Sequence, residues 1–184
     1  MIDRAQSYAT EAHRGQNYGP TDKPYTYHLE RVVAVLQRFG IEDENLLAAG
    51  WLHDIIEDTK TTAKDLHQEF GPRVAALVDA VTDGLGETRE ARKQRPYSLI
   101  PKVPDAVCLK LADRIANLEA SIDEGHKRLL DRYAQEHTGF VAALYCGSYL
   151  PMWEYLAQLF EKHGCGNVGW AVVCSHSAEE TQHE

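Results

Sequence analysis

The amino-acid sequence predicts an all-α fold, and two observations lead to this prediction. Along most of the chain, apolar residues recur three and four positions apart, which is the spacing of an amphipathic helix. No segment alternates apolar and polar residues strongly enough to predict a β-strand. With 184 residues and no internal repeat, the chain is long enough to form one domain with its own core.

Composition and charge narrow the classes of function. The chain is 43% hydrophobic and 26% charged, which is ordinary for a soluble globular protein. It has no apolar run of about 18 residues and no secretory signal, and its four cysteines form no Cys-x-x-Cys pair, so we expect a cytoplasmic protein without a membrane span. The net charge of −9 disfavours nucleic-acid binding, although a metal ion and a local basic patch would still allow a small phosphorylated ligand.

The first two predicted helices are joined by a loop. Ile2 to Gln16 has small and apolar residues at helical spacing, with Gly15 near its end. Asn17 to Pro24 is rich in turn formers and is predicted as a loop that can line a pocket. Tyr25 to Phe39 is the second helix and carries His28 in its first turn. Taken alone, His28 favours the interpretation of a surface or helix-end histidine.

The third predicted helix, Glu44 to Ile56, is apolar until it reaches the sequence HDIIEDT. Residues four apart share a helix face, so His53 would lie beside Glu57, and Asp54 beside Asp58. An imidazole and carboxylates would then face a metal ion. Three acids within five positions repel one another unless a cation or solvent relieves the repulsion. The alternative interpretation is a solvated acidic helix end.

Two shorter helices follow in the sequence. Thr62 and Asp65 resemble a capping box, which predicts a helix over Ala63 to Phe70. Gly71 ends that helix, and proline at the next position suits the start of another over Pro72 to Thr82.

Leu85 to Pro104 is the most polar stretch in the middle of the chain and is rich in arginine and lysine. One interpretation is a solvated helix followed by a loop set by its prolines. The other is a mobile basic flap that closes over phosphates, and it depends on a phosphate site being established separately.

Asp105 to Ile122 is predicted to be a long buried helix. Asp113 lies inside its apolar run, where a carboxylate is destabilising unless it is paired or bound to a metal. The neighbouring Arg114 is about 100° round the helix and need not be its partner. Asp113 is therefore a stronger candidate ligand than His28 taken alone.

Two further helices are predicted over Lys127 to Leu144 and Pro151 to Phe160, followed by a polar tail. We expect one domain over residues 1–164 and a tail over residues 165–184. A zinc site can be drawn in the tail region, but its spacing fits no ligand pattern: Cys165, Cys174, His176 and His183.

The candidate metal ligands lie on three different predicted helices and form an H…HD…D pattern: His28, His53, Asp54 and Asp113. A shell of nitrogen and carboxylate oxygen suits Mn²⁺ or Fe²⁺ better than a thiolate-rich zinc site does. Such an ion would polarise a phosphate and lower the pKa of an attacking water. Glu57 and Asp58 would orient that water and exchange its proton.

The pattern is that of the HD-domain phosphohydrolase superfamily, and the chain most resembles the hydrolase domain of RelA/SpoT proteins and the stand-alone small alarmone hydrolases. The shared motifs occur in the same order: AHRGQ (12–16), PYTYH (24–28), HDIIEDT (53–59), FGPRV (70–74), VTDG (81–84) and KLADRIANL (110–118). The resemblance covers Ala5 to Ala120. It implies an HD-domain bundle of roughly eight to ten helices around a metal site, with a helical extension over residues 121–164.

The resemblance implies hydrolysis of guanosine tetra- and pentaphosphate, the alarmones of the stringent response, at the 3′ position. The products would be GDP or GTP and pyrophosphate. A single Mn²⁺ would be held by the four ligands, with Fe²⁺ or another divalent ion as the alternative. Glu57 and Asp58 would be the acid/base pair, and Asn117 would contact the ribose or base. The intact Glu-Asp pair favours a hydrolase over a degenerate domain.

The loop over residues 17–23 departs from the family pattern. The relatives carry an Arg-Lys pair there that helps to hold the guanine and its phosphates, whereas this loop has only Lys23 as a basic residue. Tyr18 would stack on a base, and Arg14 or Lys23 would supply positive charge. Two alternatives therefore stay open: an HD phosphatase acting on another phosphorylated nucleotide, such as NADPH at its 2′-phosphate or a nucleoside monophosphate, and a non-catalytic nucleotide sensor. A homodimer is also left open.

Overall fold

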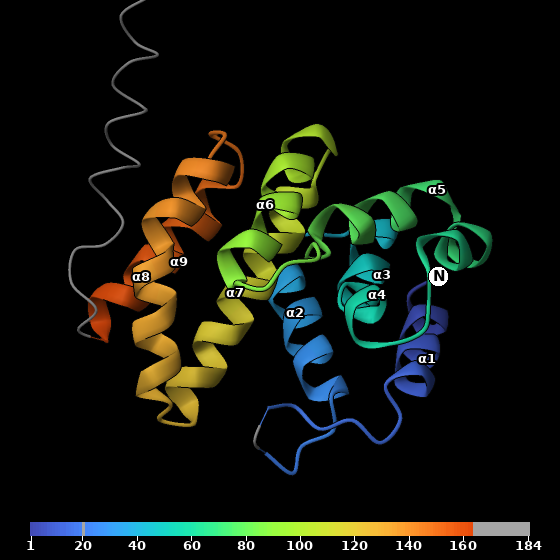
Figure 1. Cartoon of the computed structure of the whole chain (residues 1–184), viewed down its shortest axis with the longest axis horizontal. Helices are drawn as coiled ribbons and strands as arrows, with labels where there is room; N and C mark the ends of the chain where they lie inside the picture. The colour runs from blue at the N-terminus through green and yellow to red at the C-terminus, as the bar shows by residue number, and fades with distance from the viewer. Residues whose placement is uncertain (20, 164–184) are drawn as a thin grey trace, which may run out of the picture. The chain divides into compact units, whose positions relative to one another are not determined.

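The computed structural model describes residues 1–19 and 21–163, and within them the helices of Figure 1 are the only regular secondary structure. The all-α prediction is therefore confirmed. In chain order the elements are α1 (Ile2–Ala12), α2 (Thr26–Arg38), α3 (Glu44–Leu52), α4 (Ile55–Asp58), α5 (Ala63–Val81), α6 (Arg89–Leu99), the 3₁₀ helix η1 (Ile100–Lys102), α7 (Ala106–Asp123), α8 (Lys127–Leu144) and α9 (Leu150–Lys162). No helix in this described part is long and apolar enough to span a membrane.

The chain divides into two compact units, Met1–Asp113 and Arg114–Glu184, which we call the first and the second unit. Helix α7 begins in the first unit and ends in the second. The boundaries predicted from the sequence, 1–164 and 165–184, stay a prediction. The zinc site drawn in the tail lies outside the described residues.

Helix α3 is the centre of the first unit, and α1, α2 and α5 all pack against it (Figure 1). Every residue from Leu46 to Leu52 is buried, as expected for a helix that is apolar on all sides. Gly50 permits a close approach between α3 and α2, because a Cβ there would lie 3.0 Å from side-chain carbons of Val33 and Leu36. The consequence is that the end of α3 delivers His53 into the interior.

Two helix ends differ most from the sequence prediction. Helix α1 ends at Ala12 rather than Gln16, and Gly15 follows with a φ of 80°. The helix predicted to reach Ile56 breaks after Leu52 and resumes as α4. These breaks occur because side chains near the helix ends are held by other segments of the unit, which local helical propensity does not register.

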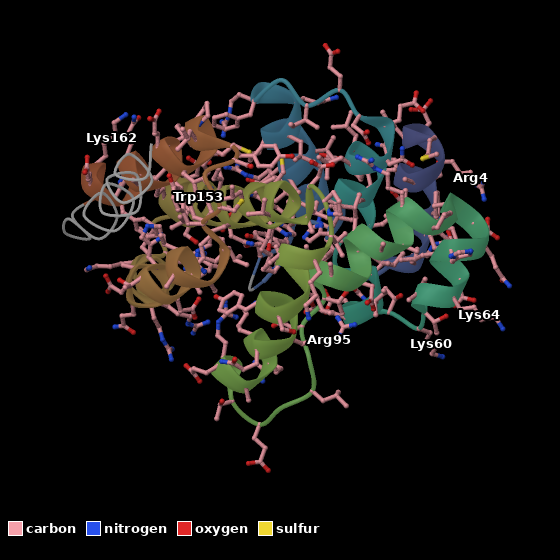
Figure 2. The ribbon with its side chains drawn as sticks, turned by 90° about the horizontal axis from the view of Figure 1, so that it is seen from above. Arg4, Lys60, Lys64, Arg95, Trp153 and Lys162 are labelled. Atoms are coloured by element: carbon pink, nitrogen blue, oxygen red, sulfur yellow. The ribbon has the colours of Figure 1, made fainter. Side chains whose placement is uncertain are left out.

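The segment after α4 agrees with the two predicted helices. Gly71 has a φ of 85° and interrupts α5 between its two halves. The predicted capping box is present: the Asp65 backbone N–H donates to the Thr62 hydroxyl at 3.2 Å, and the Thr62 N–H donates to the Asp65 carboxylate at 2.8 Å. Charged side chains of this unit such as Arg4, Lys60 and Lys64 point outward (Figure 2).

The second unit contains the end of α7 with α8 and α9, and an aromatic cluster forms its core. Trp153 is 2% exposed, and its ring lies 5.6 Å from both Phe140 and Tyr145, measured between ring centroids. Tyr155 on α9 donates a hydrogen bond of 2.6 Å to Glu119 on α7. These contacts join the three helices of the unit.

Candidate metal centre

Four side chains from α2, the α3–α4 junction and α7 meet inside the first unit: His28, His53, Asp54 and Asp113. The Nε2 atoms of the two histidines are 3.2 Å apart. His28 Nε2 lies 3.4 Å from both Asp54 Oδ2 and Asp113 Oδ1. His53 Nε2 lies 3.0 Å from Asp54 Oδ2 and 3.8 Å from Asp113 Oδ1. The structure thus brings together all four candidate ligands.

The break between α3 and α4 is what turns both HD side chains toward α2. His53 follows the last residue of α3 as its C-cap, and Asp54 precedes α4 with φ −97° and ψ −3°. The backbone therefore changes direction between α3 and α4. His53 Nδ1 lies 2.9 Å from the carbonyl oxygen of Gly50, which accepts a hydrogen bond from the Nδ1–H group. The Nε2 atom of neutral His53 therefore carries a lone pair toward the other ligands.

A divalent cation fits this donor set. Ligands bound at about 2.1 Å from one ion lie about 3 Å apart when they are at right angles, which matches the shorter separations in the cluster. Two imidazole nitrogens facing each other at 3.2 Å require a proton or a cation between them. The residues present are therefore those that could hold a metal ion.

Without a cation, the same arrangement strongly perturbs the protonation of its members. Burial opposes the charged form of His28, but hydrogen bonds and charges from Asp113 and Asp54 raise its pKa to about 9. Burial likewise opposes protonation of His53, and the neighbouring Asp54 carboxylate outweighs it and raises the pKa. Although burial of Asp54 acts in the opposite direction, the two histidines hold the pKa of its carboxyl well below the usual range. A site that stabilises positive charge this strongly is suited to a cation.

Lys110 is a buried partner of the cluster that sequence reasoning left without a role. Its Nζ atom lies 3.0 Å from Asp113 Oδ2, and the residue is 8% exposed. Although burial of Asp113 acts in the opposite direction, the Lys110 ammonium helps to hold the pKa of that carboxyl far below its usual range. The available signal was a lysine three residues before an aspartate within an apolar helix.

Tyr25 is a second partner that sequence reasoning missed. Its hydroxyl donates a hydrogen bond of 2.7 Å to Asp54 Oδ2. Burial, together with the nearby charges of Asp54 and Asp58, raises the pKa of Tyr25 far above its usual value. The phenol is therefore a hydrogen-bond donor throughout the physiological pH range.

The candidate acid/base residues Glu57 and Asp58 lie on α4, directly after the metal-ligand candidates. Glu57 Oε1 accepts a hydrogen bond of 2.6 Å from the backbone N–H of Asp83. Partial burial and the charge of Asp54 raise the pKa of Glu57, despite that N–H donor. The Asp83 carboxylate in turn pairs with Lys93 Nζ at 3.0 Å. A chain of contacts thus connects Glu57 to α6.

The basic segment over residues 85–104 forms α6 and η1, and α6 is docked on the end of α5. Arg95 donates to the backbone carbonyl oxygens of Asp79 at 2.5 Å and Thr82 at 3.0 Å. A Cβ on Gly84 would lie 2.9 Å from the Cβ of Arg95, so glycine permits this close approach. The segment is therefore a helix in which some basic side chains make contacts within the chain, and both interpretations of its role stay predictions.

The residues predicted to bind the substrate include Tyr18, Lys23 and Arg14, and these three make contacts within the chain. The Tyr18 ring stacks on the His28 ring, with centroids 5.3 Å apart and an angle of 7° between the planes. Lys23 Nζ lies 4.0 Å from the centroid of the Tyr27 ring. Arg14 forms an ion pair with Glu11 in the preceding turn of the chain and is largely exposed. Asn117 belongs to the second unit, and its contact with a nucleotide stays a prediction.

Comparison with known proteins identifies a family and several relatives of this chain. A model of the HD domain matches residues 5–144, which extends past the predicted end of the resemblance at Ala120. The GTP pyrophosphokinase of Streptomyces coelicolor is 36% identical over 141 residues, which are 74% of this chain and 16% of that protein. The guanosine-3′,5′-bis(diphosphate) 3′-pyrophosphohydrolase MESH1 of Mus musculus is 32% identical over 166 residues, which are 87% of this chain and 93% of that protein.

A solved structure is similar over most of the chain. It is of a metazoan ortholog of SpoT described as hydrolysing ppGpp and acting in starvation responses. The TM-score is 0.77 with 30% sequence identity, and the alignment covers 89% of this chain and 96% of that chain. The chain spans only 16% of the length of the Streptomyces relative, so that protein's activity as a whole is not a guide to this one.

Proposed function

This chain belongs to the HD-domain family, and on this basis we propose that it is a metal-dependent phosphohydrolase that removes pyrophosphate from the 3′ position of guanosine tetra- and pentaphosphate. The observation that carries the proposal is the meeting of two imidazole nitrogens and two carboxylates next to Glu57. The relatives named as 3′-pyrophosphohydrolases support the choice of substrate. We place the activity in the cytoplasm, in keeping with the thiols of Cys108 and Cys146, which form no disulfide within the described part of the chain.

The four candidate ligands would hold one Mn²⁺, with Fe²⁺ as the alternative ion: His28, His53, Asp54 and Asp113. Bound there, a divalent ion supplies Lewis-acid chemistry to the phosphate group of the substrate. The two histidines would contribute Nε2 lone pairs, and the buried position of both rings would keep bulk water away from the metal–nitrogen bonds.

Glu57 is the proposed general base of the hydrolysis. The water oxygen forms a bond to the phosphorus attached to the ribose 3′ oxygen, and the bond between that oxygen and phosphorus breaks. Glu57 takes the proton from the water, and its raised pKa favours this role near neutral pH. Asp58, the next residue, donates a proton to the departing 3′ oxygen, which leaves as a hydroxyl, and this balances the proton that Glu57 takes up. The products are GDP or GTP and pyrophosphate.

Two lysines give the acidic site the positive charge that phosphates require. Lys110 lies against Asp113, and Lys93 lies against Asp83. Burial and the charge of Lys110 lower the pKa of Lys93, so the two ammonium groups are close enough to affect each other. Their positive charges locally offset the formal net charge of −9 at the site where a phosphorylated ligand would bind.

The loop over residues 17–23 favours a second candidate substrate. Tyr18 and Lys23 contact the chain's own aromatic rings, so the loop offers a different surface from the Arg-Lys pair expected of alarmone hydrolases. The second candidate is therefore another phosphorylated nucleotide, with NADPH and its 2′-phosphate as the first to test. A non-catalytic nucleotide sensor is the third possibility, and the Glu57 contacts argue against it because a sensor needs no general base.

The proposal is tested by incubating the purified, Mn²⁺-supplied protein with guanosine tetraphosphate and separating the products by ion-exchange chromatography. Release of GDP and pyrophosphate is the expected result. Release of phosphate from NADPH or another nucleotide, with guanosine tetraphosphate intact, would keep the phosphohydrolase and replace its substrate. No product from any nucleotide, in a sample shown to contain bound metal, would leave the sensor interpretation. The matched inactive control is Glu57→Gln.

A further inference from the structure

Apart from Arg14 and His28, the residues of two sequence motifs, AHRGQ and PYTYH, have no assigned role in the reaction, yet the two motifs meet beside the candidate metal ligands. The hydroxyl of Tyr25, from the second motif, donates a hydrogen bond of 2.7 Å to Asp54 Oδ2. This is the same oxygen that lies 3.0 Å from His53 Nε2 and 3.4 Å from His28 Nε2. The hydroxyl therefore contacts the very atom by which Asp54 would bind the ion.

The ring of Tyr25 is held in place by His13, from the first motif. The two rings are stacked, with centroids 4.5 Å apart and planes 10° from parallel, and His13 is 3% exposed. His13 Nδ1 lies 2.8 Å from the side-chain oxygen of Gln16. Among the described residues, His13 Nε2 is buried and has no hydrogen-bond partner, so Nδ1 makes the one hydrogen bond of this ring. The ring is fixed by stacking and by that bond.

Gln16 connects the same group to the segment that carries the candidate acid/base residues. Its side-chain amide donates to the backbone carbonyl oxygen of Asp58 at 2.9 Å. Its own backbone carbonyl accepts from the Tyr25 N–H at 3.0 Å, and its N–H donates to the His13 carbonyl at 3.0 Å. Tyr25, His13 and Gln16 are thus joined by ring stacking and hydrogen bonds. The group contacts Asp54 through the Tyr25 hydroxyl and Asp58 through the Gln16 amide.

We propose that Tyr25, fixed by His13 and Gln16, is a positioning residue. It orients the Asp54 carboxylate toward the two histidines and holds it at a fixed position relative to Asp58. A carboxylate rotates easily about its terminal torsion, so an unsupported Asp54 would point at the ion for only part of the time. A hydrogen bond to a ligating carboxylate removes that freedom, and loss of such a contact typically weakens metal binding by 10- to 100-fold.

The chemistry of the donor suits this task. The phenol is neutral, so it orients the carboxylate without bringing a positive charge that would compete with the ion. Asp113 differs, because its partner is the ammonium of Lys110. His13 acts through Tyr25 and not as a ligand, because its ring is stacked on Tyr25 and its Nδ1 is hydrogen-bonded to Gln16.

The test compares Tyr25→Phe with Tyr27→Phe. Both variants lose one hydroxyl from the same helix end, but the Tyr27 hydroxyl accepts from Arg31 at 2.9 Å and contacts none of the candidate ligands. Metal-stripped full-length protein is titrated with Mn²⁺, and the free ion is followed by electron paramagnetic resonance. We expect the Kd of Tyr25→Phe to rise about 10- to 100-fold and that of Tyr27→Phe to change by less than about threefold.

A second variant, His13→Phe, retains an aromatic ring for stacking and removes the bond to Gln16. We expect a smaller rise in the Mn²⁺ Kd, about threefold to tenfold, because Tyr25 keeps its hydroxyl but loses part of its support. Thermal unfolding of each metal-stripped variant shows whether it is folded, and His13→Phe provides the readout should Tyr25→Phe fail to fold.

The inference rests on the proposed metal centre, and the titration separates the two. If the unaltered protein binds no Mn²⁺, the metal centre itself is wrong and the positioning role is wrong with it. If the unaltered protein binds Mn²⁺ and folded Tyr25→Phe binds it equally well, the positioning role alone is overturned and the metal centre stands.

Discussion

Both units of the molecule contain completely buried histidines, and their environments have opposite effects. His28 and His53 in the first unit and His137 in the second are 2%, 1% and 1% exposed. Carboxylates raise the pKa of His28 to about 9 against its burial. Burial and the charge of Arg114 lower the pKa of His137 to about 4, and its ring packs 4.7 Å from that of Phe160.

This comparison shows that burial of a histidine does not by itself identify a functional site. A neutral imidazole that packs against a phenylalanine next to a guanidinium behaves as a core residue. An imidazole of equal burial that faces two carboxylates and another imidazole has a local charge that only a proton or a cation balances. The charges around the ring distinguish the two regions, and each prediction below tests that distinction.

The largest expected effect comes from the same substitution made in both units. His53→Phe removes one nitrogen donor, and we expect the protein to lose its bound ion because three ligands remain around a buried pair of acids. His137→Phe should leave the bound metal unchanged. Metal content after desalting, measured by inductively coupled plasma mass spectrometry, checks both. Equal loss in the two variants would show that metal is bound elsewhere or non-specifically.

Glu57→Gln should lower turnover by at least about 100-fold, because removal of a general base typically has an effect of this size. Metal content should stay as in the unaltered protein, since Glu57 is outside the four-residue ligand set. Initial rates at saturating substrate, with Asp65→Asn on the exposed start of α5 as the control, provide the measurement. Turnover retained in Glu57→Gln would remove Glu57 from the mechanism.

Lys93→Met tests whether α6 helps to hold Glu57. The substitution leaves the Asp83 carboxylate without its ammonium partner, and the Asp83 N–H that donates to Glu57 should lose its fixed position. We expect kcat to fall about tenfold, with recovery in Lys93→Arg, which keeps the charge. Steady-state kinetics separate this effect from the contribution of Lys93 to phosphate binding, which would appear as a rise in KM.

The smallest predicted effect concerns stability at acid pH and belongs to the second unit. The pKa of His137 is lower in the folded protein, about 4, than in the unfolded chain, where it is about 6.5. The unfolded chain therefore binds the proton first as pH falls, and stability decreases from pH 6.5 toward pH 4. This residue should account for about 2 kcal/mol of lost stability between pH 7 and pH 5.

The check is urea unfolding of metal-stripped protein at both pH values. His137→Phe should remove this part of the acid dependence, because phenylalanine does not titrate. An unchanged dependence in His137→Phe would mean that His137 is protonated, or exposed, in the folded protein.

The sequence predicted the all-α class and brought four candidate ligands to attention, but it left their surroundings undetermined. The HD pair and Asp113 stood out because polar residues interrupt apolar helical stretches. The tyrosine-to-aspartate contact could not be predicted, since Tyr25 and Asp54 are 29 positions apart and meet only when α2 packs against α3. The helix break after Leu52 was missed for a similar reason, because the junction is held by contacts with α2.

The loop over residues 17–23 shows most clearly what the sequence alone could not predict. Tyr18 was expected to stack on a nucleotide base, and that expectation stays a prediction, but one face of its ring lies on His28. Residue type indicated a stacking role, whereas the stacking partner depends on how the chain returns from Gly15 to Pro24. A backbone hydrogen bond of 2.9 Å, donated by the Tyr18 N–H to the Lys23 carbonyl oxygen, closes this loop.

Gly50 has no functional group, yet it governs how near the two histidines can come. Its missing side chain lets α2 lie against α3, and the carbons of Val33 and Leu36 already stand 3.0 Å from the place a methyl would occupy. An alanine here would push the Val33 and Leu36 side chains by a few tenths of an ångström, so a related chain can retain every histidine and aspartate of the motif and still have α2 and His28 displaced. Surveys that assign activity from the motif alone would count such a chain as an enzyme, so position 50 belongs among the positions they inspect.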